Sequence, residues 1–488
     1  MTDPSAASLL PVAVTLAVAL SLRNVLVGLF SGVLVGALML ADVDVLRFLP
    51  TVIREYIVPE VADTYNASVL VLLAFIGGFV GLIEWSGGGA AFARSAVRFV
   101  TSKVRAELGA WFAGIAIFFS DLGTPLIVGP VFQPLADRLR LSRQKLAFVL
   151  DSTSSPVAIL IPFIGWGVFI MSVIADAFQN NGLEQSEWDA FVAAIPFQIY
   201  AWLAIAIVPI LAALRFDFGP MANAVAMPPQ ASTSTSAADA GKPIVVWLPL
   251  AVLGVSLFAM LHQLGFPTQQ IAGSDFRAGL AAAYLLAAAT LIGLLLLLRL
   301  RPLVDVLARY VQGMSGMLPI AATLVLAWTL GAMSDALGTG SYVAEVARDG
   351  VSGAILPAVV FVLAALVSFA TGSSWGTIVI MMPLAVPAAV ATGAPLPVTI
   401  GAVLSGGLFG DHSSPVSETT LLSSTGAGTT PLAHFSTQLP YALLNGTIAI
   451  LGFIVAGATG FVWIVPLTIV VQLILLLALR RLLGERTD

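Results

Sequence analysis

Four carboxylates stand apart from other charges in this sequence. Asp121 and Asp151 are each the only Asp, Glu, Lys or Arg of a long apolar stretch, while Asp411 and Glu418 lie in a region without any Lys or Arg. An ionisable residue inside a membrane is costly and is a functional candidate by default. Because a carboxylate holds either a proton or a cation, these acids predict ion binding. The alternative is helix capping for Asp151 and Asp411, and a position facing water for Glu418.

Helix-breaking residues accompany these acids. A Gly-Thr pair lies close to Asp121, and a Ser-Ser-Pro motif follows both Asp151 and Asp411. Gly permits unusual backbone dihedrals, Pro fits the first turn of a helix, and Ser, Thr or Asp caps its start. Each motif is therefore expected to end one half-helix and begin another, with a simple packing kink as the alternative for any single motif.

The oxygen atoms at such breaks suit particular ligands. Free carbonyls, hydroxyls and carboxylates are hard ligands for an alkali cation, and the N-terminus of a half-helix favours an anionic group. His412 is expected to cap or hydrogen-bond the broken backbone, with the relay of protons near neutral pH as the alternative, and His434 is expected to lie at an interface, at the end of a segment. The expected ion- or substrate-binding residues are Asp121, Thr124, Asp151, Ser154, Ser155, Ser373, Thr377, Asp411, Ser413, Ser414 and Glu418.

The elements that carry these residues must lie in a lipid bilayer. Of 488 residues, 59% are hydrophobic and 10% are charged, and the mean hydropathy is +1.00. Soluble domains are about one quarter charged. The absence of cysteine excludes disulfides and thiolate metal sites. A net charge of -5 without a basic patch argues against nucleic acid as a partner.

The apolar runs divide the chain into two parts. A spanning helix needs about 20 apolar residues, and the runs predict about 11 to 13 membrane segments. Those at 108–137 and 146–175 are expected to be interrupted. The polar, low-complexity stretch 215–242 is predicted to be a linker between a first transmembrane repeat, 1–214, and a second one, 243–488.

Similar motifs occur in the same order in both parts. Gly123 and Gly376 each begin a Gly-Thr pair that is followed six residues after the Thr by Pro, and Ser154 and Ser413 each begin a Ser-Ser-Pro motif. Interrupted segments at corresponding positions are typical of transporters built from repeats, whose substrate sites lie at the repeat interface near the midplane. Backbone at that depth unwinds only where protein or a wet cavity surrounds it, so we expect the breaks to point inward.

The longest of these motifs carries a family resemblance. The stretch from Phe409 to Ala427 resembles the signature of the NhaC-type Na+/H+ antiporter family of the ion transporter superfamily, and further matches lie in 129–157 and 370–377. This resemblance implies an all-α polytopic membrane protein of two inverted structural repeats, with interrupted helices and re-entrant hairpins. It also implies Na+ and protons as coupling ions, and a homodimer as the assembly often found. The Na+ ligands expected on this basis are Asp121, Ser155, Thr377 and Asp411.

The chain departs from the family pattern at four positions. Ser120 stands where the family commonly has a first acid before Asp121, and Thr124 stands where an Asn is usual. Glu418 replaces the more common Asp, and Ser413 a frequent Cys. A site with one carboxylate fewer is expected to move fewer protons, or to use the ion to drive another solute.

The sequence therefore predicts a Na+-coupled secondary transporter of the cell inner membrane, most specifically a Na+/H+ antiporter. The alternative is Na+- or H+-driven transport of an amino acid or small organic acid. No enzyme activity and no cofactor other than the coupling ion Na+ are expected. An intramembrane protease using Asp121 and Asp411 lacks the usual sequence contexts, and a channel would leave the paired breaks unexplained. Runs of Arg and Lys at 94–105, 138–145, 299–309 and 480–481 mark the expected cytoplasmic surface.

Overall fold

The computed structural model describes residues 5–40, 48–97, 100–225, 242–265 and 273–483. Over these residues the chain is helical and has no strand. Seven helices are long and apolar enough to cross a membrane, or eight if the bent pair Glu187–Phe197 and Ile199–Leu214 is one span. Shorter apolar helices are Ala6–Leu22, Val25–Leu40, Gly165–Gln179 and Leu356–Thr371. The chain is an all-α, multi-pass membrane protein, as predicted.

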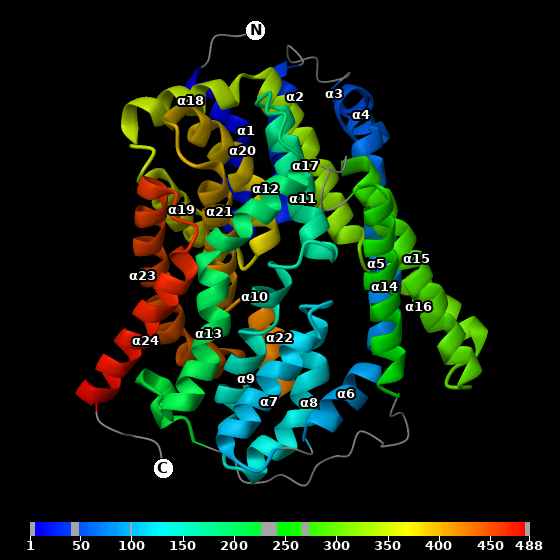
Figure 1. Ribbon diagram of the computed structural model, residues 1–488. Coiled ribbons are helices and arrows are strands. Elements are labelled where there is room, and N and C mark those ends of the chain that lie inside the picture. The colour runs from blue at the N-terminus through cyan, green and yellow to red at the C-terminus, as the bar shows by residue number, and fades with distance from the viewer. Residues whose placement is uncertain (1–4, 41–47, 98–99, 226–241, 266–272, 484–488) are drawn as a thin grey trace.

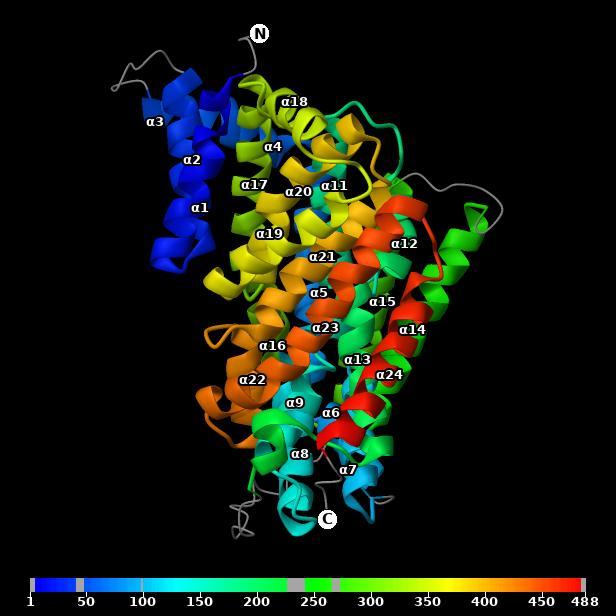
Figure 2. The same ribbon diagram turned by 90° about the vertical axis from the view of Figure 1, so that its left-hand side faces the viewer.

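The first part of the chain forms helices up to residue 97. They are a 3-10 turn (Ala6–Leu9), α1 (Leu10–Leu22), α2 (Val25–Leu40), α3 (Phe48–Thr51), a π-helix (Val52–Ile57), α4 (Val58–Ala62), α5 (Thr64–Trp85) and α6 (Gly88–Val97). Gly28 and Gly32 allow α2 to lie directly on α1, because a Cβ at either position would meet Thr15. Figure 2 shows α1 and α2 at one edge, beside the upper half of the molecule.

The next part of the chain supplies the first set of interrupted elements. They are α7 (Lys103–Ala116), α8 (Gly123–Arg138), α9 (Arg143–Asp151), α10 (Ser155–Ala158), α11 (Gly165–Gln179), α12 (Glu187–Ala194), a 3-10 turn (Ile195–Phe197) and α13 (Ile199–Leu214). α7 and α8 form a hairpin, and a break at 152–154 separates α9 from α10. The interruptions expected in 108–137 and 146–175 are therefore present.

The second part of the chain also contains a hairpin followed by an interrupted helix. It contains α14 (Ile244–Gln263), α15 (Gly273–Leu297), α16 (Leu303–Ser315), α17 (Leu318–Ala336), α18 (Thr339–Gly350), α19 (Leu356–Thr371), α20 (Ser374–Thr392), α21 (Leu396–Ser413), α22 (Glu418–Ala427), α23 (Pro431–Thr459) and α24 (Ile464–Leu483). α19 and α20 form a hairpin closed at Gly372, whose φ of 67° favours glycine. A break at 414–417 then separates α21 from α22.

The two hairpins enter the molecule from opposite ends. Figure 1 shows α7, α8 and α9 in the lower half, and α19 and α20 in the upper half. Gly123 and Gly376 both lie at the start of the second helix of a hairpin, and Ser154 and Ser413 both adjoin the break of the next helix. The paired motifs thus occupy equivalent places in the chain order. The inverted relation of the two repeats stays a prediction.

Part of the predicted linker is packed against the helices. Residues 226–241 lie outside the described residues, but 215–225 are described and include a 3-10 turn, Gly219–Asn223. Asp217 accepts hydrogen bonds from Lys145 Nζ (2.5 Å) and Tyr441 Oη (2.7 Å). The start of this stretch therefore contacts both α9 and α23.

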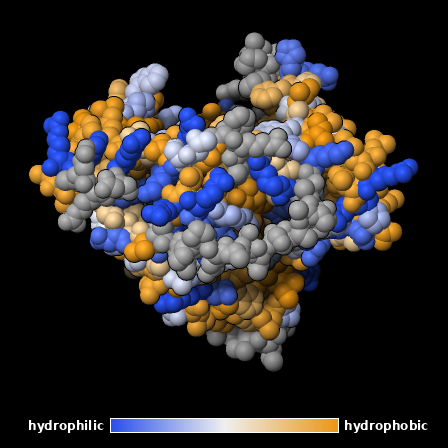
Figure 3. All heavy atoms as spheres, turned by 90° about the horizontal axis from the view of Figure 1, so that it is seen from below, coloured by the Kyte–Doolittle hydropathy of each residue, from blue (hydrophilic) through white to orange (hydrophobic). Residues whose placement is uncertain are grey.

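The outer surface has the apolar character that lipid requires. Large apolar side chains are exposed on helices at the periphery, among them Val255 of α14, Leu297 of α15 and Ile474 of α24. Seen from below, hydrophobic side chains gather on the outer flanks and hydrophilic ones across the middle of this end (Figure 3). This distribution fits a molecule whose flanks contact the bilayer and whose ends meet water.

Candidate functional site

Asp121 lies at the tip of the first hairpin, in the non-helical turn between α7 and α8. Its Oδ2 atom accepts a hydrogen bond from Trp166 Nε1 on α11 (2.8 Å) and a longer one from Ser155 Oγ at the start of α10 (3.5 Å). The hairpin tip thus contacts the start of α10 and the start of α11, which both follow the break at 152–154. Asp121 and Ser155, two of the four expected Na+ ligands, therefore lie within hydrogen-bond distance of each other.

A second acid lies beside this tip. Ser120 Oγ donates a hydrogen bond to Glu84 Oε1 of α5 (2.5 Å) and accepts one from the backbone N–H of Gly123 (2.9 Å). Glu84 also interacts electrostatically with Asp121. Ser120, which stands where the family commonly has an acid, therefore binds a carboxylate supplied by another helix.

The tip of the second hairpin is held by its own polar residues. Ser373 caps α20 by accepting a hydrogen bond from the Gly376 N–H (3.2 Å), and Thr377 Oγ1 donates to the Ser373 carbonyl (2.8 Å). The ring of Trp375 packs against Trp166, with 4.5 Å between the centroids. Because Trp166 also binds Asp121, this one side chain connects the two hairpin tips.

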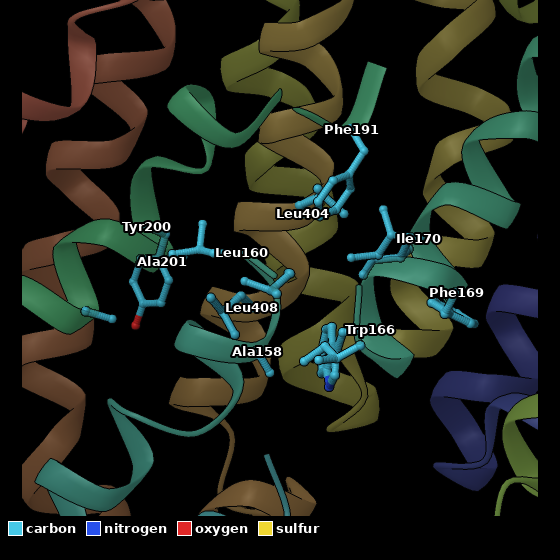
Figure 4. Close-up of a cluster of buried hydrophobic side chains, with 14 of the residues drawn as sticks. Ala158, Leu160, Trp166, Phe169, Ile170, Phe191, Tyr200, Ala201, Leu404 and Leu408 are labelled. Atoms are coloured by element: carbon cyan, nitrogen blue, oxygen red, sulfur yellow. The ribbon is translucent and has the colours of Figure 1, made fainter. Parts of the chain in front are cut away.

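Buried apolar side chains surround this connection. In Figure 4, Trp166 lies among side chains from α10 to α13 and α21, including Leu160, Phe169, Leu404 and Leu408. Trp166 is only 3% exposed. A carboxylate in such surroundings has few water molecules to solvate it, so its interactions with an ion are strong.

Asp411 lies at the end of α21, directly before the second break. Its Oδ2 atom accepts a hydrogen bond from Thr419 Oγ1 (3.1 Å), and Thr419 is also bonded to Ser417 Oγ (2.9 Å), the cap of α22. Asp411 interacts electrostatically with both Asp121 and Asp151. Glu418 begins α22 and is exposed. The helix-end position of Asp411 agrees with its predicted place at a break.

Asp151 lies fully buried at the end of α9 and contacts the second half of the chain. Its Oδ1 accepts from Ser423 Oγ (3.3 Å), and its Oδ2 accepts from Gln438 Nε2 (2.6 Å). The Nε2 atoms of His434 and His412 lie 3.3 Å and 3.7 Å from the same Oδ2. Asp151 is therefore a point where the two halves meet.

Other predicted residues use their hydroxyl protons within their own segment. These bonds join Thr124 Oγ1 to the Ser120 carbonyl (2.9 Å), Ser154 Oγ to the Asp151 carbonyl (2.9 Å) and Ser413 Oγ to the Phe409 carbonyl (2.6 Å), and Ser414 Oγ accepts from the Val416 N–H (3.4 Å). Thr124, Ser154 and Ser413 each donate their hydroxyl proton, so their oxygen lone pairs stay available to a cation, whereas Ser414 Oγ is itself the acceptor. Within the described chain, no hydrogen bond joins Thr377 or Asp411 to Asp121 or Ser155.

Several residues of the site were not predicted. His434, expected at an interface, is instead completely buried against Asp151. His412, expected to hydrogen-bond the broken backbone, meets Tyr200 Oη through its Nδ1 (2.8 Å). A sequence signal for this cluster is the spacing of His434 and Gln438, which lie four residues apart and therefore share one face of α23.

Comparison with known proteins places the chain in a family. The sequence profile described as "Na+/H+ antiporter family" matches residues 157–458. An uncharacterized protein of Haemophilus influenzae is 30% identical over 473 residues, which cover 93% of this chain and 91% of that protein. The malate-2H(+)/Na(+)-lactate antiporter of Bacillus subtilis is 35% identical over 96 residues, 20% of each chain.

The fold is also similar to that of a solved transporter. The structure of MtrF of Neisseria gonorrhoeae, described among antimetabolite efflux pumps, superimposes with a TM-score of 0.60 at 16% identity over 85% of each chain. Named relatives and structural neighbours are transporters rather than enzymes. The chain is a secondary transporter and belongs to the Na+/H+ antiporter family.

Proposed function

We propose that this protein exchanges Na+ for protons. The observation that carries the proposal is the contact of Asp121 at a hairpin tip with Ser155 at the break of another helix. It brings a carboxylate and a hydroxyl together next to unwound backbone, which supplies carbonyl oxygens. Hard oxygen ligands of this kind suit Na+. Membership of the Na+/H+ antiporter family supports the same function.

In this proposal Asp121 and Ser155 hold Na+ in a site from which Trp166 is displaced. The Trp166 N–H now occupies Asp121 Oδ2 at 2.8 Å, which is the place a cation would take. A hydrogen bond can neutralise part of the carboxylate charge while no ion is bound. Thr377 and Asp411, expected as further ligands, stay predictions, since each is bonded within its own segment.

Transport of an organic solute is the second candidate. The named Bacillus relative exchanges malate with protons for lactate with Na+, so a related substrate class is open to this chain. The capped N-terminus of α20 would favour an anionic group. At the N-terminus of α22, by contrast, Glu418 in the first turn would repel one. A carboxylate substrate would therefore be expected at the tip of the second hairpin.

The cell inner membrane is the proposed location. The chain has many apolar helices, and its family is that of Na+/H+ antiporters. An antiporter works only in a membrane that carries ion gradients. Na+ serves as the coupling ion, and no other cofactor is proposed. A homodimer stays a prediction from the family resemblance.

A proteoliposome assay tests the antiport proposal. A pH-sensitive dye trapped inside liposomes reports proton movement when Na+ is added outside. We expect a Na+-specific signal with the unmodified protein and its loss in Asp121→Asn. Asp349→Asn is the matched control, because Asp349 is an exposed acid on α18. No Na+-driven signal from the unmodified protein would reject antiport, and Na+-dependent uptake of labelled lactate or malate would then support the second candidate.

A further inference from the structure

The Na+ proposal leaves a second buried polar group unused. It consists of Asp151, His412, His434 and Gln438, here called the Asp151 cluster. Asp151 and His434 are both fully buried, and Gln438 is 2% exposed. Gln438 Nε2 donates to both Asp151 Oδ2 (2.6 Å) and the His412 carbonyl (2.5 Å). The cluster joins α9 of the first half to α21 and α23 of the second half.

The surroundings of Asp151 contain polar atoms that lack a partner. Within the described residues these buried atoms are Ser152 Oγ, His412 Nε2, Thr420 Oγ1, His434 Nδ1 and Gln438 Oε1. Buried polar groups are normally hydrogen-bonded, and a group that is not requires an explanation. These atoms belong to residues that contact Asp151, that adjoin it in the chain, or that lie one turn of α22 from its partner Ser423. Their grouping indicates a place where hydrogen bonds change during the transport cycle.

The charges that face Asp151 come from few groups. On α9 itself, Lys145 is paired with Asp217 and Arg143 with Asp137, and Glu107 of α7 faces Lys145. The other titratable groups near Asp151 are Tyr200 on α13, Asp411 and His412 on α21, and His434 on α23. In the described part of the chain, the basic groups that face Asp151 are therefore the two histidines.

This set of groups suits a proton better than Na+. With neutral histidines the cluster carries the single negative charge of Asp151, and one added proton makes it neutral. An uncompensated charge in a dry interior is costly, so a neutral cluster is strongly favoured. Two imidazoles face the carboxylate, whereas Na+ prefers oxygen ligands. A proton also needs no cavity.

We propose that Asp151 and His434 hold the exchanged proton, in a site separate from the Na+ site at Asp121 and Ser155. This inference rests on the antiport function proposed above. The proton is shared along the contact of His434 Nε2 with Asp151 Oδ2, where the distance is 3.3 Å. Gln438 orients Asp151 through its hydrogen bond to Oδ2, and it is itself bonded to the carbonyl of His412, whose ring is held by Tyr200.

The same backbone segment connects the two sites. Asp151 begins the broken segment 151–155, and Ser155, at its other end, contacts Asp121. A change in the contacts of Asp151 is therefore passed on to a ligand of Na+ through four covalently linked residues. Asp411 interacts electrostatically with both Asp151 and Asp121, so the charge of one site is also felt at the other. This arrangement couples the release of a proton to the binding of Na+.

Two transport modes separate the proposal from a shared site. In proteoliposomes, Na+/H+ exchange is followed with the trapped pH dye, and Na+/Na+ exchange is followed with isotopic Na+ at saturating concentration. We expect Asp151→Asn and His434→Gln to lose Na+/H+ exchange but to keep Na+/Na+ exchange. Their half-saturating Na+ concentration should no longer depend on pH. Asp121→Asn should lose both modes, and Asp349→Asn should keep both.

Each other outcome overturns the proposal. If both variants keep Na+/H+ exchange with an unchanged pH profile, the cluster holds no transported proton. If both lose Na+/Na+ exchange as well while they elute as monodisperse protein, one shared site is required. If the unmodified protein shows neither mode, the antiport function itself is wrong and the inference falls with it. Uptake of labelled lactate by the same protein then distinguishes this failure of the antiport function from a failure of the proton site alone. His434→Gln keeps the test decisive if Asp151→Asn does not fold.

Discussion

At the scale of single residues, Trp166 is the side chain that contacts both hairpin tips at the proposed Na+ site. Its Nε1 donates to Asp121 Oδ2 at 2.8 Å, and its ring lies 4.5 Å from that of Trp375 at the tip of the other hairpin. A hydrogen bond to a charged group contributes about 1.5–3 kcal/mol. The N–H donates into a lone pair of this oxygen and withdraws part of its negative charge, so the indole competes with Na+ for the carboxylate.

Trp166→Phe is therefore expected to bind Na+ more tightly. The substitution removes the N–H and keeps an aromatic ring against Trp375. We expect the half-saturating Na+ concentration for transport, measured at alkaline pH, to fall by about threefold to tenfold. A change of this size corresponds to part of the free energy of the lost hydrogen bond. Trp202→Phe is the matched control, since Trp202 donates its N–H to the Ile195 carbonyl instead. Weaker Na+ binding in Trp166→Phe would show that the indole positions Asp121 rather than competing for it.

The sequence alone identified some polar residues of the candidate site but not the side chains that they contact. Isolated acids beside Gly-Thr and Ser-Ser-Pro motifs made Asp121, Ser155, Asp151 and Asp411 site candidates, because their types and neighbours are local properties. Their partners are distant in the chain, since His434 and Asp151 are 283 residues apart and Trp166 and Asp121 are 45 apart. No local pattern encodes such contacts. A histidine near the end of an apolar segment was therefore wrongly expected at an interface.

At the scale of elements, the first hairpin and the second broken helix depend on a close approach of their backbones. Gly129 of α8 lies against Gly426 of α22, and a Cβ on Gly129 would meet the Gly426 carbonyl group. A Cβ on Gly426 would likewise meet the Pro125 carbonyl of α8. Since backbone atoms cannot rotate away as side chains do, an added methyl must push the two helices apart.

Gly129→Ala is expected to destabilise this contact between the halves. Overpacking of a dense interior costs about 1–3 kcal/mol, and the variant should melt at a lower temperature in detergent. Gly254→Ala is the matched control, because Gly254 lies within α14 with nothing within 4 Å of a Cβ. The control should melt at the same temperature as the unmodified protein or above it, since Ala favours helix. Equal melting of both variants would contradict the close approach of α8 and α22.

The elements themselves were largely predictable, because apolar runs and breaking residues act locally. The runs 108–137 and 146–175 both contain the interruptions that Gly, Pro and Ser predicted. Short amphipathic helices were harder to identify, as α18 shows. It begins at Thr339 and mixes Glu345, Arg348 and Asp349 with apolar residues. A polar helix at a membrane surface has the composition of a loop, so periodicity alone must identify it.

At the scale of the whole molecule, positive charge collects at one end. Figure 1 places α6, the start of α7 and the end of α8 at the lower end, and α24 runs down to it. These elements carry Arg94, Lys103, Arg138 and the pair Arg480 and Arg481. Arg301, before α16, lies over the ring of Trp85 at the end of α5, next to α6. Because cytoplasmic loops carry the excess of Lys and Arg, we expect this end to face the cytoplasm.

The absence of cysteine makes this orientation directly testable. Arg138 ends α8 at the lower end, and Asp349 lies on α18 at the upper end; both are exposed. Since the natural chain has no cysteine, Arg138→Cys and Asp349→Cys each introduce a single thiol. In intact cells, a membrane-impermeant maleimide should label Asp349→Cys and should label Arg138→Cys only after the membrane is opened. The reverse pattern would invert the assignment, and would place the start of the α7–α8 hairpin, and with it the nearer entrance to Asp121, outside the cell. Labelling of both thiols in intact cells would contradict their position at opposite ends of the membrane-spanning structure.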